Sequence, residues 1–521
     1  MLSYIREILP KFSCSYTSPV VWFIDYICLW RKSLSSTSHT KHRVGFFYEK
    51  LYIKKISSYS IEIIKPIMSV YSINPATEET LEEIRYISKD ELMLKIEQAH
   101  KAYTQWRKIS FFDKSTYFKT LIDIFEREKE TLARIDAIEM GMPIREALGD
   151  VSKSIANIAY FIQNAERMIA PESFEKDDIR WQIRYEPMGA VYMVAPWNFP
   201  INQVIRSTIP NIIAGNVMLV KHASNVPQMA RKLETMFLEA GFPTWVYTHL
   251  SIPWSYSEDI ISHPHIIGVT ITGGDKAWRT IWGLAGKYLK PSVLELGGSD
   301  PLIILSYTDR EKIVWQAILG RMANNWQKCN SSKRIIILDE YYDDFSQTFT
   351  EKISSLRLWN PLDRDTEIWP LARLDLLEEI HAHVESSIAA WARLFTGGKK
   401  IAGEWYYYEP TVLTEVIPGM SVFDEEIFGP VAPLIRARDI DHAIELANMS
   451  RYGLGCSILW GTTEEQSYIA ERVACANVTL WGIVTSYPWL PYGGIKDSWY
   501  GKELGLDGIR TFLNQKVIVR K

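Results

Sequence analysis

Residues 265–286 read "HIIGVTITGGDKAWRTIWGLAG" and decide the fold class of this chain. A short apolar run, 265–272, meets the glycine pair Gly273 and Gly274, and a helix-like segment follows directly. This order predicts a buried strand, a tight turn and the start of a helix. A strand that leads through a turn into a helix is the repeating unit of sheets whose strands run parallel.

The same unit recurs on the N-terminal side of this stretch. Residues 189–200, "GAVYMVAPWNFP", and residues 215–224, "GNVMLVKHAS", have the composition of buried strands, and the amphipathic segment 203–214 separates them. Strands that alternate with helices of about 10–15 residues indicate a parallel sheet with helices on both faces. The sequence therefore predicts an α/β fold with a doubly wound sheet.

The rest of the sequence divides into regions of different character. Residues 88–168 repeat apolar residues at three- and four-residue spacing behind Ser88, a possible helix cap, so this region is predicted to be mainly helical. A second α/β stretch begins at Leu302. Residues 180–194 and the tail 512–521 alternate like exposed strands, and such strand edges usually pair with another strand.

Length and composition limit the function classes. At 521 residues the chain is too long for one hydrophobic core, so two or three domains are expected. It is 47% apolar and 23% charged with a net charge of −4, which makes nucleic acid or a membrane surface an unexpected partner. Five cysteines without a CxxC or a Cys/His cluster predict no disulfide scaffold, no metal site and a reducing, cytoplasmic location.

Residues 1–67 differ from the remainder of the chain. They contain ten Lys or Arg against four acidic residues, whereas the remainder is acidic. Their apolar stretch "PVVWFIDYICLW" is shorter than the roughly 20 residues that a membrane-spanning helix needs. Because Met68 and the residues after it read like a fresh start, we expect 1–67 to be an upstream extension without function; a transit peptide is the alternative.

Four kinds of residue carry possible chemistry. Gly273 and Gly274 would present free N–H groups and a positive helix end to a phosphate, and Lys221 at a strand end could meet a ribose hydroxyl or a phosphate. Cys329 lies in the polar loop "NNWQKCNSSKR", and Glu295 lies in an apolar run, where burial would raise its pKa as a general base requires. Turn glycines, a solvated lysine, an incidental thiol and a buried acid satisfied by backbone donors are the purely structural alternatives.

Seven motifs in a fixed order link these residues. The chain contains "APWNFP" (195–200), "VKHAS" (220–224), "TITGG" (270–274), "LELGGSDP" (294–301), "NNWQKC" (324–329), "DEEIFGPV" (424–431) and "LPYGGIKDS" (490–498). From about residue 70 to 520 the sequence thereby resembles the aldehyde dehydrogenase superfamily, and most of all its bacterial succinate-semialdehyde dehydrogenases. The resemblance implies a doubly wound cofactor domain, an α/β catalytic domain with the cysteine, and a small β element that pairs between the subunits of a homodimer or homotetramer.

This resemblance implies a division of the chain. It gives 1–67 as the extension, 68–171 with 195–296 as the dinucleotide-binding domain, 297–490 as the catalytic domain, and 172–194 with 505–521 as the oligomerisation element.

The resemblance also implies roles for individual residues. Cys329 would add to the aldehyde carbonyl, and the side-chain amide of Asn198 and the backbone N–H of Cys329 would hold the oxyanion. Hydride transfer to the cofactor would leave a thioester, and Glu295 would activate the water that releases the acid. No metal is implied.

The cofactor would lie along a second set of residues, which are Trp197, Lys221, Ser224, Gly273, Gly274, Glu426 and Phe428. Relatives that prefer NAD often place an acid three residues after this lysine, where it bonds the ribose 2′-hydroxyl. Ser224 occupies that position here and would not repel a 2′-phosphate, so NADP is expected and NAD is the alternative. Arg321 is a candidate for holding the substrate carboxylate, and Lys328 could attract an anionic substrate.

Tryptophan stands where the resemblance leads us to expect glycine. The eight positions are Trp245, Trp278, Trp326, Trp359, Trp369, Trp391, Trp405 and Trp499. The chain has 28 Gly, whereas an average of about 7% would give about 36. Our hypothesis is that UGA codons read as glycine in the source organism were translated as tryptophan. If Trp326 is genuine, an inactive dinucleotide-binding paralogue is the alternative; a dehydrogenase for another small aldehyde is a further one.

Overall fold

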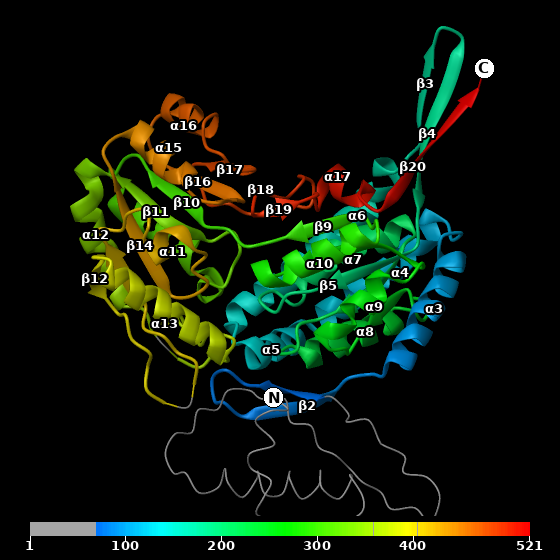
Figure 1. Ribbon diagram of the computed structural model, residues 1–521, viewed down its shortest axis with the longest axis horizontal. Coiled ribbons are helices and arrows are strands. Elements are labelled where there is room, and N and C mark those ends of the chain that lie inside the picture. Colours follow the sequence, from blue (N-terminus) through cyan, green and yellow to red (C-terminus); the bar gives the residue numbers. More distant parts are fainter. Residues whose placement is uncertain (1–68, 358, 404, 521) are drawn as a thin grey trace, which may run out of the picture. The chain divides into compact units, whose positions relative to one another are not determined.

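Two large sheets organise the protein in the computed structural model, which describes residues 69–357, 359–403 and 405–520. The expected extension 1–67, including Cys14 and Cys28, lies outside the described residues. Figure 1 shows the two sheets with their helices, and a β-ribbon that carries the C-terminal strand.

The first sheet contains the stretch from which the fold was predicted. Its six strands have the order β19-β9-β8-β5-β6-β7, and all pairs are parallel except β19 with β9. The strands are β5 (Ala190–Val194), β6 (Val217–Lys221), β7 (Tyr247–His249), β8 (Ile266–Thr272), β9 (Ser292–Glu295) and β19 (Trp499–Tyr500). After β8 the chain turns at Gly274 into α10 (Asp275–Lys287). The predicted α/β fold with a parallel sheet is confirmed.

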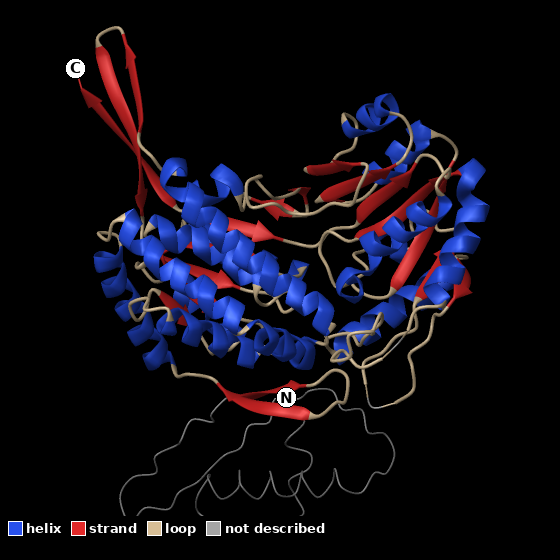
Figure 2. Cartoon of the chain, turned by 180° about the vertical axis from the view of Figure 1, so that it is seen from behind, coloured by secondary structure: helices blue, strands red, loops and turns tan. Residues whose placement is uncertain are grey.

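Helices cover both faces of this sheet (Figure 2). The predicted helical region forms α3 (Lys89–Trp106), α4 (Phe111–Arg127), α5 (Lys129–Met140) and α6 (Ile144–Met168). Ser88 does cap α3, because its hydroxyl accepts from the N–H of Glu91 while the Glu91 carboxylate accepts from the N–H of Ser88. The other helices of this part are α7 (Asn202–Ala214), α8 (Pro227–Glu239), η2 (Trp254–Tyr256) and α9 (Ser257–Ile261).

The second sheet begins with β10, which contains Leu302, the residue from which a second α/β stretch was expected. Its seven strands have the order β12-β13-β14-β11-β10-β16-β17. They are β10 (Asp300–Ile304), β11 (Ser332–Leu338), β12 (Arg393–Thr396), β13 (Thr411–Thr414), β14 (Val431–Ala437), β16 (Gly455–Leu459) and β17 (Asn477–Leu480). The helices of this part are α11 (Arg310–Met322), η3 (Ala323–Trp326), α12 (Asp339–Ser354), α13 (Leu374–Ala389), α14 (Ser421–Asp424), α15 (Ile440–Asn448) and α16 (Thr463–Ala470). Cys329 lies in the connection from η3 to β11.

A three-stranded ribbon joins two distant parts of the sequence. Strand β4 (Ile179–Pro187) pairs with β3 (Glu172–Lys176) on one side and with the C-terminal β20 (Leu513–Arg520) on the other. The residues next in sequence, β5, are wholly buried in the six-stranded sheet, so only the first part of 180–194 belongs to the ribbon. The remaining elements are β1 (Ser69–Ile73), β2 (Thr80–Arg85), β15 (Tyr452–Gly453), β18 (Ile495–Lys496) and α17 (Gly505–Arg510). No helix in the described part of the chain is long and apolar enough to cross a membrane.

Tryptophan is strongly over-represented in left-handed backbone. Of the thirteen non-glycine residues at positive φ in the described ranges, five are tryptophans. Trp245, Trp326 and Trp391 belong to the eight suspected positions, with φ of 77°, 64° and 78°, and Trp460 and Trp481 are additional, both at 58°. Left-handed backbone costs an L-residue about 1–2 kcal/mol and suits glycine. These five backbones are therefore those of glycine positions. Trp278, Trp369 and Trp499 have no such φ.

Replacing Trp391 with glycine should raise the free energy of unfolding by about 1 kcal/mol. The Trp391 side chain is 90% exposed, so its removal loses little packing while the left-handed strain disappears. Trp489 is the matched control, since it is 54% exposed but lies outside the left-handed region. Urea unfolding should show stabilisation for Trp391→Gly and a loss of about 0.5–1 kcal/mol for Trp489→Gly. Equal losses for the two variants would contradict the strain argument.

Candidate active site

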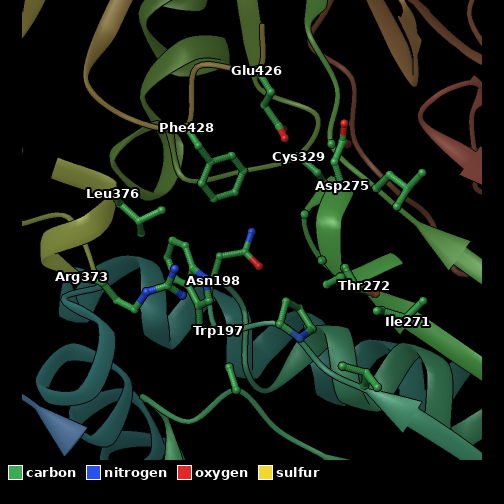
Figure 3. Close-up of a pocket in the computed structure, with 18 of the residues that line it drawn as sticks. Trp197, Asn198, Ile271, Thr272, Asp275, Cys329, Arg373, Leu376, Glu426 and Phe428 are labelled. Carbon is green, nitrogen blue, oxygen red and sulfur yellow. The ribbon is translucent and has the colours of Figure 1, made fainter. Parts of the chain in front are cut away.

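A cavity of about 630 Å³ opens at the carboxyl ends of the strands of the six-stranded sheet. Residues that follow β5, β6, β8 and β9 line one side, and residues of α13 and of the loop before β14 line the other. Figure 3 shows Cys329 at this cavity together with Asn198, Thr272 and Glu426. Parallel α/β sheets bind ligands at this end of their strands, because loops and helix N-termini converge there.

The Cys329 thiol is half-buried at the cavity. Burial, and to a smaller extent the nearby Glu295 carboxylate, raises its pKa to about 12, while Lys333 and Arg206 act in the opposite direction. The thiol is therefore protonated in the resting protein. A base must remove its proton before the sulfur can act as a nucleophile.

Glu295 supplies a carboxylate beside this thiol. It ends β9, is fully buried, and holds Oε1 at 3.9 Å from Cys329 Sγ. Burial raises the pKa of Glu295 to about 7, although the ion pair with Arg206, with a nitrogen–oxygen distance of 2.9 Å, lowers it in part. Thr272 Oγ1 donates to the other carboxylate oxygen at 3.2 Å. A carboxylate with a pKa near neutrality can accept a proton from the thiol or from water.

Asn198 is fixed by two hydrogen bonds to the loop that carries the cysteine. Its side-chain Nδ2 donates to the carbonyl of Gln327 at 2.9 Å, and Asn324 Nδ2 donates to the backbone carbonyl of Asn198 at 2.6 Å. An amide nitrogen carries two N–H groups, so one of them remains for another acceptor. A donor fixed in this way can stabilise an oxyanion that develops next to the thiol.

All seven residues expected at the cofactor line the cavity: Trp197, Lys221, Ser224, Gly273, Gly274, Glu426 and Phe428. The rings of Trp197 and Phe428 meet edge to face with centroids 5.7 Å apart (Figure 3). Glu426 Oε1 accepts from Lys333 Nζ at 2.7 Å and from the N–H of Gly298 at 3.0 Å.

Lys221 and the glycine turn leave donors for a ligand. Among the described residues, the Lys221 ammonium donates only to the His222 carbonyl, at 3.2 Å, and burial lowers its pKa to about 8. A Cβ built on Gly274 would meet nothing within 4 Å, because this residue, which precedes α10, faces open space. The N-terminus of α10 is thus accessible to an anionic group.

Several residues of the site were not singled out from the sequence. Arg206 is the sole charged residue of α7, whose residues are all buried, and it pairs with Glu295 and with Glu503, the latter at 2.7 Å. The single charged residue in this buried helix could have indicated a site residue from the sequence, because a buried charge needs a partner. Arg373 also lines the cavity, with its guanidinium 5.7 Å from the ring centre of Trp197.

Arg321, the expected candidate for the substrate carboxylate, is committed elsewhere. It is wholly buried and donates to the carbonyls of Ile427, Gly429 and Val431 and to the hydroxyl of Ser331. Its guanidinium therefore holds the loop before β14. Trp326 packs against it, with its ring centre 5.6 Å from the guanidinium carbon, and is also wholly buried. Its indole N–H has no hydrogen-bond partner among the described residues.

Comparison with known proteins gives a consistent result. The family described as "Aldehyde dehydrogenase family" matches residues 66–518. The chain is 38% identical to the succinate-semialdehyde dehydrogenase [NADP(+)] 1 of Mycobacterium ulcerans, over 87% of this chain and 99% of that protein. It is 31% identical, with a TM-score of 0.84, to a crystal structure of the succinic semialdehyde dehydrogenase of Streptococcus pyogenes in complex with NADP+, over 86% of this chain and 99% of that one. The succinate-semialdehyde dehydrogenase of Burkholderia pseudomallei also has a TM-score of 0.84, at 28% identity, over 87% and 94%.

Proposed function

We propose, from the premise that this chain belongs to the aldehyde dehydrogenase family, that it oxidises succinate semialdehyde to succinate with NADP+. The chain is an NAD(P)-dependent aldehyde dehydrogenase. The observation that carries the proposal is the 3.9 Å approach of the Cys329 thiol to the Glu295 carboxylate, beside a cavity lined by the expected cofactor residues.

The chemistry that we assign to this chain's own residues begins with a proton transfer. Glu295 accepts the proton of Cys329, and the sulfur adds to the aldehyde carbonyl. The free N–H of the Asn198 side chain and the backbone N–H of Cys329 donate to the oxyanion of the thiohemiacetal. After the substrate carbon has lost hydride, Glu295 gives up the thiol proton to solvent and removes a proton from the water that attacks the thioester. The C–S bond then breaks, and the acid and the Cys329 thiolate are released. Each of these roles is a proposal for the residue named.

The cavity residues fit a dinucleotide. Within the described part of the chain, the Lys221 ammonium has no carboxylate partner and no side chain caps the N-terminus of α10, so both can bind a diphosphate. Glu426 and Phe428 line the same cavity as Cys329, and they would hold the nicotinamide ribose and ring. When bound, NADP+ supplies the acceptor for the hydride.

NADP is preferred over NAD on the identity of one residue. Ser224 lines the cavity where a carboxylate would select the 2′-hydroxyl of NAD. The mycobacterial relatives are named as NADP enzymes, which agrees with this preference. Measuring kcat/KM with each cofactor tests it, and a higher value with NAD would reject it.

The function is tested by rapid mixing of the protein with NADP+ and aldehyde. A burst of NADPH with succinate semialdehyde, larger than that with butanal, would support the proposal. A higher kcat/KM for butanal would favour a dehydrogenase of neutral aldehydes. This is the second candidate because Arg321, the arginine expected to bind the carboxylate of succinate semialdehyde, is bound to backbone carbonyls instead. Cofactor binding without a burst would identify an inactive dinucleotide-binding paralogue.

The rate of aldehyde oxidation should fall about tenfold per pH unit below pH 7. Burial first of all raises the pKa of Glu295 to about 7, and this group must be unprotonated to act as a base, so acid removes the active form. Steady-state kcat/KM from pH 5.5 to 9 should show this acid limb. The limb should vanish in Glu295→Gln, whose residual rate has no such base; an unchanged limb would assign it to another group.

Organisation of the chain follows the same proposal. We assign 68–171 with 195–296 to cofactor binding, 297–490 to catalysis, and 172–194 with 505–521 to oligomerisation. The ribbon supports the last assignment, because Val517 and Val519 of β20 are more than half exposed. An exposed ribbon edge with apolar residues can pair with a second subunit. A homodimer or homotetramer in the cytoplasm is therefore proposed, and light scattering of the purified protein tests the assembly.

A further inference from the structure

Four cationic side chains act electrostatically on Cys329: Lys153, Arg206, Lys328 and Lys333. Two of them are neutralised by carboxylates. Arg206 pairs with Glu295 and Glu503, and Lys333 Nζ lies 2.7 Å from Glu426 Oε1. The positive charge of the other two is not balanced in this way.

Lys153 is a half-buried cation whose partner is neutral. It lies on α6, and its Nζ donates to the hydroxyl of Ser486 at 2.9 Å. No ion pair of Lys153 exists among the described residues, and the carboxylate of Asp150, one turn earlier, accepts from the N–H of Asn202. Burial, together with the charges of Lys328 and Arg206, lowers the pKa of Lys153 to about 8, while the charges of Asp150 and Cys329 act in the opposite direction. An ammonium has three N–H donors, so two remain for an anion.

Lys328 adds a second cation without a carboxylate in contact. It precedes Cys329, and no hydrogen bond or ion pair of its ammonium is found within the described ranges. Burial lowers its pKa, while Cys329, Glu146 and Asp300 act against this shift. Partly desolvated charges of one sign are costly unless an opposite charge joins them.

These groups approach the thiol from outside the cofactor cavity. Cys329 lines that cavity, but Lys153, Lys328 and Ser486 do not. A second contact connects α6 to the segment that carries Ser486, since the rings of Tyr160 and Trp489 lie 6.2 Å apart. An anion held by Lys153 would therefore not take the place of a dinucleotide in the cavity.

We propose that Lys153, assisted by the hydroxyl of Ser486 and by the charge of Lys328, binds the carboxylate of an aldehyde substrate that carries a terminal acid. The proposal rests on the proposed function and names the residue that makes an anionic aldehyde the preferred substrate. The carbonyl end would lie at Cys329 and the anionic end at Lys153. Lys153 is then a substrate-binding residue, and its ammonium supplies the charge that Arg321 cannot.

The test compares two aldehydes of equal length in three variants. With Lys153→Met we expect KM for succinate semialdehyde to rise by at least about tenfold with little change in kcat, while kcat/KM for uncharged butanal stays within about twofold. Lys153→Arg should restore most of the affinity because it keeps the charge. Lys119→Met, at an exposed position of α4, is the matched control and should leave KM and kcat unchanged for both aldehydes.

An equal decrease of kcat/KM for both aldehydes in Lys153→Met would mean that the lysine has a structural role, and it would overturn the proposal. An unchanged KM for succinate semialdehyde would overturn it as well. Succinate binding, measured by calorimetry on the protein with NADP+ present, gives an answer that does not depend on turnover. Wild-type protein should bind succinate at least about tenfold more tightly than Lys153→Met. If no aldehyde is oxidised by the wild type, the proposed function fails, whereas equal succinate binding by the two proteins refutes the role of Lys153 alone.

Discussion

Replacing Cys329 with serine should lower kcat for aldehyde oxidation by roughly 10⁴-fold or more. The structure offers no substitute nucleophile, because Cys329 is the sole cysteine among the cavity residues in the described part of the chain. A serine hydroxyl is far less acidic than a thiol, and Glu295, with a pKa of about 7, is too weak a base to deprotonate it. The measurement is the steady-state rate with succinate semialdehyde and NADP+.

The Cys329→Ser variant should fold and bind the cofactor as the wild type does. Fluorescence titration with NADPH should give the same Kd for Cys329→Ser as for the wild type, since Lys221, Ser224 and the N-terminus of α10 are untouched. Cys475→Ser is the matched control, because Cys475 is also half-buried but lies in the turn before β17, outside the cavity. A Cys329→Ser enzyme that kept a tenth of the wild-type rate would refute the role of Cys329 as the nucleophile.

Local patterns were sufficient for the fold and for the reacting groups. The stretch 265–286 predicted a strand, a turn and a helix, and the structure has β8, Gly274 and α10 there. Glu295 was recognised as a carboxylate in an apolar run, and it is wholly buried. Such signals are readable because periodicity and the contrast between polar and apolar neighbours depend on adjacent residues.

Contacts across the fold were not predictable in the same way. Lys153 and Ser486 meet although 333 positions separate them, and no local pattern indicates which lysine is left without a carboxylate. Residues 180–194 were expected to form exposed strands. The structure confirms this for β4, which is exposed or half-buried, but β5 is fully buried inside the six-stranded sheet. Arg321 is the opposite case: its residue type suits a carboxylate ligand, but tertiary packing gives its donors to backbone carbonyls.

The loop of Cys329 contains Trp326, a tryptophan that is both buried and in left-handed backbone. Trp326 has a φ of 64° and is completely buried, and its indole N–H makes no hydrogen bond to the part of the chain that is described. Asn324, two residues earlier, also has positive φ, but asparagine tolerates this region. The same turn places Gln327, whose carbonyl fixes the Asn198 amide. Strain in this turn therefore acts on both the nucleophile and the oxyanion donor.

Replacing Trp326 with glycine should raise kcat/KM by about 10- to 100-fold, because small displacements of reacting groups have effects of this size. The free energy of unfolding should change little: the loss of a buried ring, about 3–5 kcal/mol, is offset by relief of strain and of the unpaired N–H, about 1–3 kcal/mol each. Trp106→Gly is the matched control. Trp106 is equally buried, but its N–H donates to the Ile212 carbonyl at 2.7 Å and its backbone is helical, so this variant should lose the full packing energy.

The residue at position 326 in the native protein decides whether the tryptophans are misread glycine codons or genuine residues of an inactive paralogue. We expect the tryptic peptide from Met322 to Lys328, isolated from the source organism, to have the mass of a chain with glycine at 326. The peptides that contain Trp245, Trp391, Trp460 and Trp481 should show glycine as well, because their backbones share the left-handed φ. Trp106 should remain tryptophan, since its N–H and its packing are satisfied. A native mass with tryptophan at 326, together with UGG codons at these positions, would refute the codon hypothesis. The catalytic turn would then be strained in the natural protein, and the chain would be a decayed paralogue with low activity.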